Sequence, residues 1–548
     1  MDYRGMSYRV SDLKIDIDKD TADLSGEIAA KIRIPREEIL DYRVIRKALD
    51  ARKKDRLYFV YTIDIRLGTK GSNLVSRRRL SGVAPIKPQP EKRPDLTAVP
   101  PVSRPIVAGA GPAGIFAALT LARAGFKPVV FERGRDVETR TRDVEEFWFN
   151  RLLDTESNVQ FGEGGAGTFS DGKLTTRIND PRVRSVLEDF VAAGAPEEIL
   201  YLNKPHIGTD VLKTVVKNLR LALEGMGGKI NFCTKVTGLL LEQGRVTGVI
   251  VNDEREIHSA EREIHSETVI MATGHSARDT YEMLEKLGCA VEQKAFSAGV
   301  RIEHPQHLID RTQYGRYAGH PKLGAADYQF VYKDKDVDRT AYTFCMCPGG
   351  RVVGAASEAG AVVTNGMSDY ARDSGVANSA VVVSITPDDL EGVHPLAGIQ
   401  FQRKWERAAF RTGGANYNAP AQLVEDFLAG RASNNLDEVP WATYLPGLEP
   451  ADLHDCLPGY VTSMLEEAIG AFDWKMKGFA FPQAVLTGVE TRTSAPVRLV
   501  RDEKRRSLGT EGLYPAGEGA GYAGGIISAA VDGIRVAEAV IERYRNPF

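Results

Sequence analysis

The alternation of apolar and polar residues marks out a small module at the start of the chain. Tyr8–Ile17 and Arg56–Leu67 have the pattern of strands, and the second alternates with a period of two, as a strand with one buried face does. Between them, the apolar residues of Glu37–Ala51 have the spacing of one helix face. These patterns predict a small α+β domain over residues 1–80.

A run of prolines separates this module from the rest of the chain. Seven prolines lie within Ser81–Pro105. Each one fixes φ and lacks a backbone N–H group, so the segment is predicted to be a semi-extended linker over residues 81–104 and not a packed element.

Directly after the linker, the pattern becomes that of a buried strand, a glycine-rich turn and a helix. Pro105–Ala108 is apolar, Gly109–Gly114 reads GAGPAG, and Ile115–Ala124 is apolar at helical spacing. A second buried strand, Pro128–Phe131, ends in Glu132. Strand, glycines, helix, strand and acid stand in the order of a dinucleotide-binding crossover.

Each glycine of this turn has a mechanical reason. Gly109 permits the tight turn, Gly111 allows a pyrophosphate to approach the backbone, and Gly114 allows the helix and strand to pack closely. The helix N-terminus then offers free N–H groups to the phosphates. Glu132 is placed to accept hydrogen bonds from the hydroxyl groups of an adenosine ribose.

Two later segments favour FAD over NAD. A short strand within Val269–Asp279 ends in Ala272-Thr273-Gly274, where backbone can pass close to a ligand. Near the C-terminus, the strand Leu513–Ala516 is followed by Gly517-Glu518 and a glycine-rich turn, and a helix is expected from about Ile526. The acid would bond a ribityl hydroxyl, and the helix dipole would stabilise negative charge on a reduced flavin.

A third glycine-rich segment, Phe161–Leu174 (FGEGGAGTFSDGKL), allows two interpretations. It could lie against an isoalloxazine ring, or it could be a surface hairpin, since Asp171-Gly172 suits a type I′ turn. The sequence contains no second strand–GxGxxG–helix unit. If NAD(P)H reduces the flavin, it is therefore expected to dock only transiently, in the cleft of an inserted domain; otherwise the substrate itself is the reductant.

These segments resemble the bacterial FAD-dependent dehydrogenases described as NAD(FAD)-utilizing dehydrogenases. The resemblance covers most of the chain and includes RKKDRLYFVYTIDIR (52–66), FGEGGAGTFSDGKL (161–174), VRIEHPQ (300–306), TFCMCPGGRVV (343–353), VVTNGMS (362–368) and TGVETRTSAPVRL (487–499). It implies one tightly held FAD in a three-layer ββα, Rossmann-like domain of the glutathione-reductase type. That α/β domain would comprise residues 105–288 and 482–548, with an α+β substrate domain inserted at 289–481.

The motifs and the resemblance together give a set of cofactor-binding candidates. These are Gly109, Gly111, Pro112, Ala113, Gly114, Glu132, Arg133, Gly164, Gly165, Thr168, Val236, Ala272, Thr273, Gly274, Gly517, Glu518, Gly524, Gly525 and Ile526. Within the inserted domain, strands are expected at Phe296–Ile302, Tyr328–Tyr332, Thr340–Cys347 and Ala380–Ile385, and helices at Ile399–Phe410, Ala421–Leu428 and Tyr460–Ala471.

Ser170, Asp171 and Lys173 are the catalytic candidates. A cation near the flavin would favour its reduced anionic form. A carboxylate and a lysine side by side could also move protons to and from a substrate. His275 is a further candidate for cofactor binding or proton transfer, with simple capping or packing as the alternative.

Cys345 and Cys347 are two residues apart in the expected strand Tyr342–Cys347, so their side chains share one face. They could form a dithiol that exchanges electrons with the flavin, or they could be small apolar residues of a core strand. Arg492 and Arg498 could bind an anionic substrate or the cofactor phosphates, or form surface salt bridges. Glu303 and His304 are expected to cap a strand end, or to line the cleft of the inserted domain.

The remaining signals concern metals, charge and location. The motif EREIHS occurs twice, at 254–259 and 261–266, which suggests a lengthened hairpin; nothing nearby completes a metal site with His258 and His265, so no metal is expected. The net charge of −3 hides a basic N-terminal region. Five cysteines, a charged N-terminus and no long apolar run favour a cytoplasmic protein without disulfides or membrane spans.

The expected function is that of an FAD-dependent oxidoreductase that transfers a hydride to or from flavin N5, with a small-molecule substrate. Two alternatives stay open at this point. The basic N-terminal module could grip RNA for a flavin-dependent modification, or it could be an ordinary solvated surface. The chain could also bind FAD without catalysing a reaction.

Overall fold

The structure is a computed structural model, and it describes residues 7–545 except 79, 87–102 and 254–260. Its chain forms two compact units. The first consists of the N-terminal module together with Pro196–Pro205 and Asp310–Ala326, and the second contains the rest of the chain.

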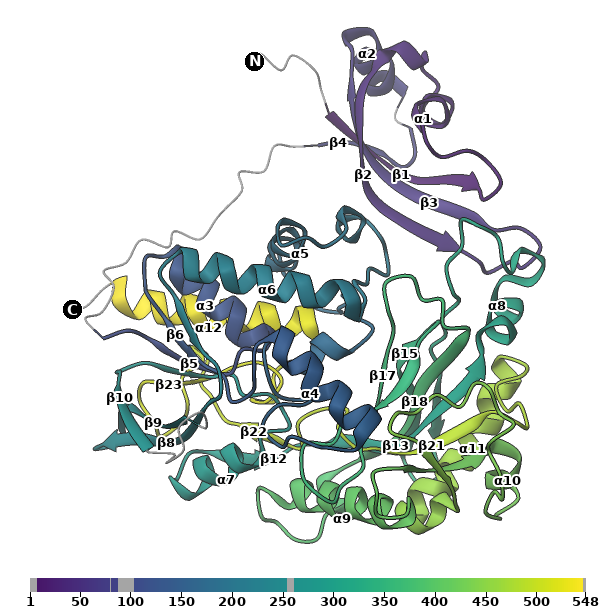
Figure 1. Cartoon of the computed structure of the whole chain (residues 1–548). Coiled ribbons are helices and arrows are strands. Elements are labelled where there is room, and N and C mark those ends of the chain that lie inside the picture. Colours follow the sequence, from purple (N-terminus) through teal and green to yellow (C-terminus); the bar gives the residue numbers. More distant parts are fainter. Residues whose placement is uncertain (1–6, 79, 87–102, 254–260, 546–548) are drawn as a thin grey trace. The chain divides into compact units, whose positions relative to one another are not determined.

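The first unit is built on an antiparallel sheet of four strands in the order β2-β3-β1-β4 (Figure 1). Its elements are β1 (Ser7–Asp16), α1 (Ser25–Ile32), β2 (Ile39–Asp50), β3 (Tyr58–Leu67), α2 (Thr69–Arg78) and β4 (Val83–Pro85). Every second residue of β3 is buried, as the alternation predicted. The two strands expected from the sequence pattern are confirmed as β1 and β3.

The helix expected over Glu37–Ala51 is wrong, because this stretch is the strand β2. β2 pairs with β3 along its whole length, with register shifts between Ile39 and Asp41 and between Val44 and Arg46. Each irregularity inserts a residue and moves the next apolar position out of the two-residue period. The resulting spacing imitates a helix.

The start of the expected linker also belongs to the sheet. Val83–Pro85 forms the edge strand β4, which pairs with β1. The prediction that these residues form no packed element is therefore wrong. A short edge strand is a position that tolerates proline. Most of the other prolines of the linker lie outside the described residues.

The second unit contains a parallel sheet of five short strands in the order β23-β11-β5-β6-β7. They are β5 (Ile106–Ala108), β6 (Val129–Phe131), β7 (Lys229–Asn231), β11 (Val269–Met271) and β23 (Leu513–Pro515). Helices α3 (Pro112–Arg123), α6 (Thr209–Gly225) and α12 (Ile526–Arg545) cover one face (Figure 1). The antiparallel sheet of β8 (Thr234–Glu242), β9 (Arg245–Asp253) and β10 (Glu261–His265) covers the other.

These layers form a mixed α/β, Rossmann-like ββα arrangement, as expected from the sequence. The order β23-β11-β5 shows that the last strand of the chain completes the sheet that β5 begins. Ile106, Ala108 and Phe131 of the parallel sheet pack against Val236 and Val249 of the antiparallel sheet, so the apolar core lies between the two β layers. The expected hairpin arm is present as β9 and β10, whereas most of the first EREIHS copy lies outside the described residues.

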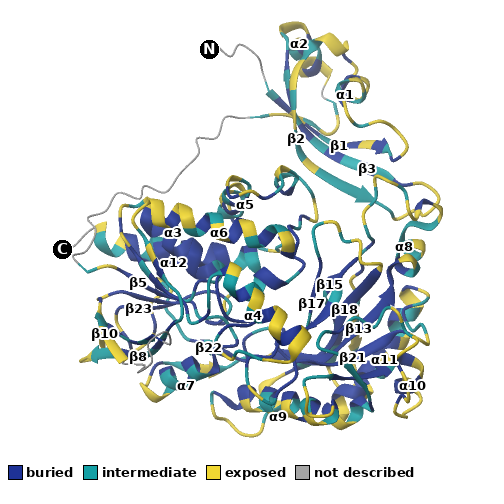
Figure 2. Cartoon of the chain, in the orientation of Figure 1, coloured by how far each residue is buried: buried dark blue, intermediate teal, exposed yellow. Residues whose placement is uncertain are grey.

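A second, larger sheet lies in the same unit, with strand order β14-β15-β18-β13-β21-β19-β20. The strands are β13 (Phe296–Pro305), β14 (Val331–Asp334), β15 (Arg339–Cys347), β18 (Val376–Ile385), β19 (Ala419–Leu423), β20 (Leu448–Pro450) and β21 (Val485–Glu490). Helices α9 (Ala397–Thr412), α10 (Val424–Leu428) and α11 (Gly459–Lys475) accompany it, with a hairpin of β16 (Arg351–Gly354) and β17 (Thr364–Met367). Figure 2 shows β13 and β18 buried in the middle of the sheet.

Most of the elements expected in this region are present, with two differences. The helix predicted at Ala421–Leu428 is wrong in its first part, because Ala421–Leu423 is paired in β19 and only the following residues are helical. β14 begins at Val331, later than the strand expected at Tyr328–Tyr332. The sheet includes β21, so it extends beyond residue 481, where the sequence placed the end of the inserted domain.

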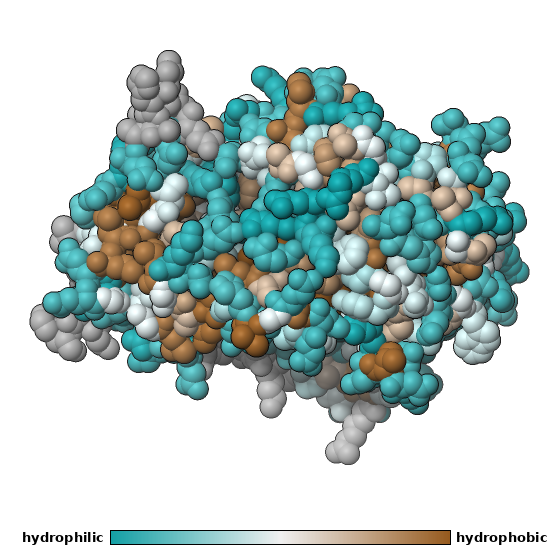
Figure 3. Space-filling view, turned by 90° about the horizontal axis from the view of Figure 1, so that it is seen from below, coloured by the Kyte–Doolittle hydropathy of each residue, from teal (hydrophilic) through white to brown (hydrophobic). Residues whose placement is uncertain are grey.

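The remaining elements are the helices α4 (Val137–Asn150), α5 (Arg182–Ala192), α7 (Arg278–Lys286) and α8 (Gln306–Tyr314), and the paired strands β12 (Val291–Gln293) and β22 (Val497–Leu499). On the face shown in Figure 3, separate hydrophobic patches are surrounded by hydrophilic residues. A helix with the length and apolarity needed to cross a bilayer does not occur within the described ranges.

The contact between α3 and β5 gives a direct test of this fold. A Cβ at Gly114 would overlap the carbonyl oxygen of Gly109. Gly114→Ala is expected to lower the free energy of unfolding by about 1–3 kcal/mol, because the helix must move away from the strand. Urea unfolding followed by circular dichroism measures this change.

The matched control is Gly225→Ala at the end of α6, where an added Cβ meets nothing within 4 Å. It should leave stability unchanged or raise it slightly, since alanine favours helices. Equal stabilities of the two variants would contradict the close packing of α3 on β5.

Candidate functional site

Four strands of the parallel sheet end at one edge, and each is followed by residues expected to bind the cofactor. β5 leads to Gly109, β6 to Glu132, β11 to Ala272–Gly274 and β23 to Gly517-Glu518. Because the strands are parallel and adjacent, their carboxyl ends converge. This edge is where open α/β sheets bind their ligands.

The turn after β5 brings backbone segments into close approach. Gly109 has a φ of 102°, and a Cβ there would overlap the carbonyl oxygen of Ala272. Gly111 forms the N-cap of α3 without a side-chain cap, and Pro112 is the first residue of the helix. A Cβ on Gly111 would come no closer than 3.8 Å to Gly165, so space remains above the helix N-terminus. The free N–H groups of Ala113 and Gly114 face that space.

The glycine-rich segment 161–169 lies over this turn and is not a surface hairpin. The N–H group of Gly164 donates to the carbonyl oxygen of Ala110 at 2.9 Å. Arg140 of α4 is fully buried, and its guanidinium donates to the carbonyl oxygens of Asn158, Val159 and Glu163. Arg140 therefore holds the backbone of this segment in place. The sequence analysis did not identify this role.

Glu132 has more partners than the sequence predicted. Its carboxylate accepts N–H groups from Ala110 at 2.7 Å, Gly134 at 3.0 Å and Gly162 at 2.9 Å. It thus ties the turn after β5 to the loop over it. Bonds to a ribose would use the lone pairs that these three donors leave.

Arg133 and Val236 contribute indirectly. Arg133 pairs with Glu156 at 2.6 Å and Asp279 at 2.9 Å, and its guanidinium lies 4.2 Å from the centre of the Phe161 ring. Val236 is buried between the two β layers. The charge of Arg133 is therefore paired, and Val236 is apolar, so neither presents a free charge to the site. Both support its walls.

At the other end of the edge, Glu518 and His275 lie close together. His275 Nδ1 is 3.6 Å from Glu518 Oε1. Burial raises the pKa of Glu518 to about 7, while burial and the charges of Arg492 and Arg278 lower the pKa of His275 to about 3. His275 is therefore neutral at physiological pH. Its Nε2 is buried and has no hydrogen-bond partner among the described residues.

The start of α12 is also open. A Cβ on Gly524 would meet nothing within 4 Å, and one on Gly525 would only touch Ser528 Oγ at 4.0 Å. Gly517 packs directly on the first turn of α3, because a Cβ there would lie 2.6 Å from the Cβ of Ala113. The loop that leads from β23 to α12 thus lies against the N-terminus of α3.

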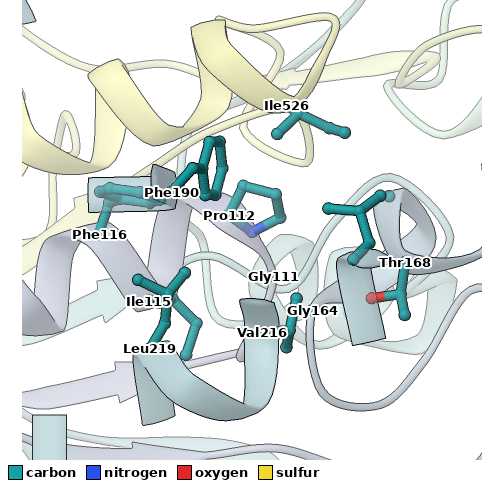
Figure 4. A pocket seen from close by; sticks show the side chains of 12 residues that line it. Gly111, Pro112, Ile115, Phe116, Gly164, Thr168, Phe190, Val216, Leu219 and Ile526 are labelled. Carbon is teal, nitrogen blue, oxygen red and sulfur yellow. The ribbon is translucent and has the colours of Figure 1, made fainter. Parts of the chain in front are cut away.

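A small pocket lies among α3, α5, α6 and the loop 164–168, and Ile526 at the start of α12 also lines it (Figure 4). Its lining is almost entirely apolar: Gly111, Pro112, Ile115, Phe116, Gly164, Gly167, Thr168, Phe190, Leu212, Val216, Leu219 and Ile526. Figure 4 shows Pro112 and Ile526 on one side, with Gly164 and Thr168 opposite Gly111. The pocket brings Thr168 and Ile526, which are far apart in the sequence, to the same place as Gly111.

The three catalytic candidates have different surroundings. Ser170 Oγ donates to the carbonyl oxygen of Gly167 at 2.7 Å, so it closes its own loop. Asp171 is buried, accepts from Ser368 and forms a bidentate ion pair with Arg372. The expected proton-transfer pair of Asp171 with Lys173 is therefore wrong, because Arg372 takes both carboxylate oxygens. In the part of the chain that the structure describes, Lys173 has no carboxylate partner.

Lys173 instead acts on the cysteine pair of β15. The neighbouring Cys347 thiol and the charges of Lys173 and Arg301 lower the pKa of the Cys345 thiol, against the opposing effect of burial. Arg301 of β13 is fully buried, pairs with Glu490 at 2.9 Å and donates to the carbonyl oxygen of Cys345 at 3.3 Å. The sequence reading did not single out Arg301, although a lone arginine inside the apolar strand FSAGVRIEH is a signal for it.

Arg492 is neither a surface residue nor a free anion-binding group. It is buried and pairs with Glu406 at 2.9 Å, which also pairs with buried Arg278. Both interpretations offered for Arg492 are therefore wrong. Arg498 does form a salt bridge at the surface, with Glu292 at 3.1 Å.

Glu303 and His304 lie near the end of β13 and are both fully buried. Glu303 accepts hydrogen bonds from the N–H and hydroxyl groups of Thr443, and His304 Nε2 lies 2.7 Å from the carbonyl oxygen of Phe479. These bonds join β13 to neighbouring segments. A cluster of three or more residues able to hold a metal ion is absent from the described ranges.

The arrangement fits FAD on observations of the structure itself. Open backbone at Gly111 and Gly524 marks the two helix N-termini, Gly274 has no heavy atom within 4 Å of its Cβ position, and His275 Nε2 lacks a partner. These features lie along one edge, from the turn after β5 to the start of α12. An extended dinucleotide needs such a series of polar contacts.

The comparisons with known proteins bear on family membership. Over 550 residues, 99% of this chain and 100% of the other, the chain is 48% identical to an uncharacterized protein of Clostridium beijerinckii (strain ATCC 51743 / NCIMB 8052). The chain belongs to the family of this clostridial protein. Residues 295–493 match the model of a family described as "FAD-dependent protein, C-terminal domain-like", and residues 7–66 match a domain of unknown function. The first description agrees with the prediction of FAD.

Solved structures with weaker similarity include several flavoproteins. A geranylgeranyl bacteriochlorophyll reductase-like protein of Thermoplasma acidophilum is 14% identical, with 81% of this chain and 79% of that chain covered and a TM-score of 0.35. The glycerol-3-phosphate dehydrogenase of Bacillus halodurans complexed with FAD is 12% identical, with 80% and 64% covered and a TM-score of 0.35. These similarities are too weak to support an inference about this chain.

The buried carboxyl group of Glu303 predicts a pH-dependent stability. Burial raises its pKa to about 8, whereas an unfolded glutamate titrates near about 4.3. At a pH between these two pKa values, unfolding therefore releases a proton. The contribution of protonated Glu303 to the free energy of unfolding is complete below the pKa of the unfolded chain, and it is lost as the pH rises through about 8. Glu303→Gln, which cannot ionise, is expected to flatten this part of the pH profile.

Urea unfolding at several pH values measures the profile, with Glu425→Gln, an exposed glutamate of α10, as the matched control. The control should keep the wild-type slope. A slope in Glu303→Gln equal to that of the wild type would show that Glu303 is already ionised in the folded protein.

Proposed function

We propose that this protein is an FAD-dependent oxidoreductase that transfers a hydride between a small-molecule substrate and flavin N5. The observation that carries the proposal is the convergence of four parallel strand ends and two open helix N-termini along one edge. A site for a mononucleotide or for NAD alone needs the first helix N-terminus but not the second.

The ADP half would bind at the turn after β5. The uncapped N-terminus of α3 offers N–H groups and the positive end of a helix dipole to the pyrophosphate. Glu132 holds the two loops that flank this position. Gly164 and Gly165 then bring the backbone of the overlying loop within reach of the same phosphates.

The flavin half would lie toward Glu518 and the start of α12. The 20-residue helix α12 places the positive end of its dipole behind Gly524 and Gly525. Lys294 adds a positive charge that acts on Glu518. When bound, FAD supplies the hydride-accepting ring, and these positive groups favour the negative charge that reduction places on it.

The larger sheet would supply the substrate side. Lys173, Arg301 and the Cys345–Cys347 pair interact electrostatically at one place, and Cys345 also acts on Glu518. Substrate groups would therefore meet cations and thiols there, next to the flavin end. NADH or NADPH is proposed as the reductant. Because the sequence has no second dinucleotide-binding unit, it would dock only transiently.

The basic residues of the N-terminal module support a solvated surface more than an RNA grip. Arg9 pairs with Asp64 at 2.7 Å, Arg52 with Asp50 at 2.7 Å and Arg56 with Asp16 at 3.3 Å. These pairs compensate part of the positive charge within the module itself.

An FAD-binding protein without catalysis would share the cofactor site but not the proposed reduction.

The proposal predicts that the purified protein contains FAD and that a physiological reductant bleaches it. Under anaerobic conditions, NADH, NADPH and a panel of metabolites are added in turn, and the flavin absorbance is recorded. At least one should reduce the flavin, and air should then restore the absorbance. A flavin that only dithionite can reduce would favour a protein that binds FAD without turnover.

A variant pair tests the site of binding. Gly524→Ala introduces a methyl group into the open space before α12 and is expected to lower the flavin content of the purified protein, because the flavin edge needs close backbone approach. Gly470→Ala in α11, where the Cβ also meets nothing within 4 Å, is the control and should keep the wild-type content. Full occupancy in both variants would contradict a flavin at this helix N-terminus.

A further inference from the structure

The cysteine pair of β15 lies in a strained part of its strand. Pairing with β18 shifts register between Phe344 and Cys347, so that Cys345 and Met346 together face a single residue of β18, Ser379. Within this bulge, Cys345 has a φ of 44°. A non-glycine residue in this conformation is costly, and such strain concentrates at functional sites.

The bulge brings the two side chains together. The Cys347 thiol donates to the carbonyl oxygen of Cys345 at 3.2 Å, so the Cys347 side chain folds back toward its neighbour. Cys347 is fully buried, whereas Cys345 is partly exposed. Cys345 is therefore the more exposed residue of the two, as in a pair in which one sulfur reacts and the second resolves.

Two cations favour the thiolate form of Cys345. Lys173 and Arg301 stabilise its negative charge, while the carboxylate of Asp171 opposes them. The pKa of Cys347 is raised, first by the neighbouring Cys345 thiol and then by burial. These effects favour a thiolate at Cys345 and a thiol at Cys347, which is the reactive form for sulfur chemistry.

The other buried cysteines differ from this pair. Burial raises the pKa of both Cys289 and Cys456, and each keeps its proton and packs as a small apolar residue. Packing alone would need neither the strained φ of Cys345 nor the cations beside it. The core-strand interpretation of Cys345 and Cys347 therefore leaves these features without a reason.

We propose that Cys345 and Cys347 form a redox-active thiol pair that exchanges two electrons with the flavin bound at the neighbouring edge. The pair lies close enough to the flavin end for Cys345 to act electrostatically on Glu518. This inference rests on the proposed flavin site and adds a second redox centre to it. Its partner in turnover would be a thiol or disulfide compound that reaches Cys345, the more exposed member.

The exchange balances in atoms and electrons. The Cys345 thiolate and the Cys347 thiol form one S–S bond and lose two electrons and the Cys347 proton. Oxidised FAD takes up both electrons and that proton and becomes the reduced anionic flavin. In the reverse direction, reduced flavin returns the electrons and the proton, and the S–S bond breaks.

An anaerobic reductive titration of the full-length, FAD-containing protein tests the proposal. With the pair oxidised, the wild type should take up four electrons per FAD, two by the flavin and two by the disulfide. Cys345→Ser and Cys347→Ser should each take up two. Cys233→Ser removes a partly exposed cysteine outside the pair and should keep the wild-type value of four.

A mass measurement on the wild type needs no variant and so does not depend on variant folding. Trypsin releases residues 340–351 (TAYTFCMCPGGR), which contain both cysteines and no other. In the oxidised protein this peptide should lack two hydrogen atoms and resist alkylation, and after reduction it should carry two alkyl groups.

The two proposals fail in different ways. A reducible flavin together with two alkylated cysteines in the oxidised protein, and an uptake of two electrons, would overturn the thiol pair and leave the oxidoreductase proposal standing. A protein that neither contains nor takes up FAD would overturn the oxidoreductase proposal, and the exchange with it.

Discussion

The structure depends on a close approach of backbone at the turn after β5. Gly109 lies against the carbonyl of Ala272, and Gly114 lies against the carbonyl of Gly109, with no room for a side chain at either position. This contact sets α3 directly against β5 and turns its N-terminus toward the carboxyl edge of the sheet. Glu132 then fixes the overlying loop to the same turn. The geometry of the proposed phosphate site follows from these few contacts.

Buried charge organises the second half of the site in a different way. Arg301 with Glu490, and Arg278 and Arg492 with Glu406, are enclosed ion pairs that connect β13, α7 and α9 with β21 and the residues that follow it. Removing one partner of such a pair lowers the stability of the protein, because it leaves an uncompensated buried charge. These pairs connect the larger sheet with the edge of the parallel sheet, and they leave Lys173 as a cation near Cys345 that has no carboxylate partner among the described residues.

The sequence predicted what depends on local pattern. The glycines after β5, the acid after β6 and the glycine-rich start of α12 each follow a short apolar strand, and the order of these signals is enough to place them at one sheet edge. The prediction from sequence failed where contacts between distant residues determine the structure. Two bulges made β2 look helical, and Arg372, about 200 positions away, replaced Lys173 as the partner of Asp171. From the sequence, Arg492 was a candidate for binding an anion, whereas in the structure its guanidinium pairs with Glu406.

The most direct test of the account measures how the flavin-free protein binds the parts of its cofactor. Isothermal titration calorimetry would compare FAD, ADP and FMN. In the proposed site, the turn after β5 and the start of α12 hold opposite halves of one extended molecule. FAD should therefore bind far more tightly than either fragment, and ADP should compete with it. Failure of FAD to bind, or binding of FMN as tight as that of FAD with no competition by ADP, would contradict the account.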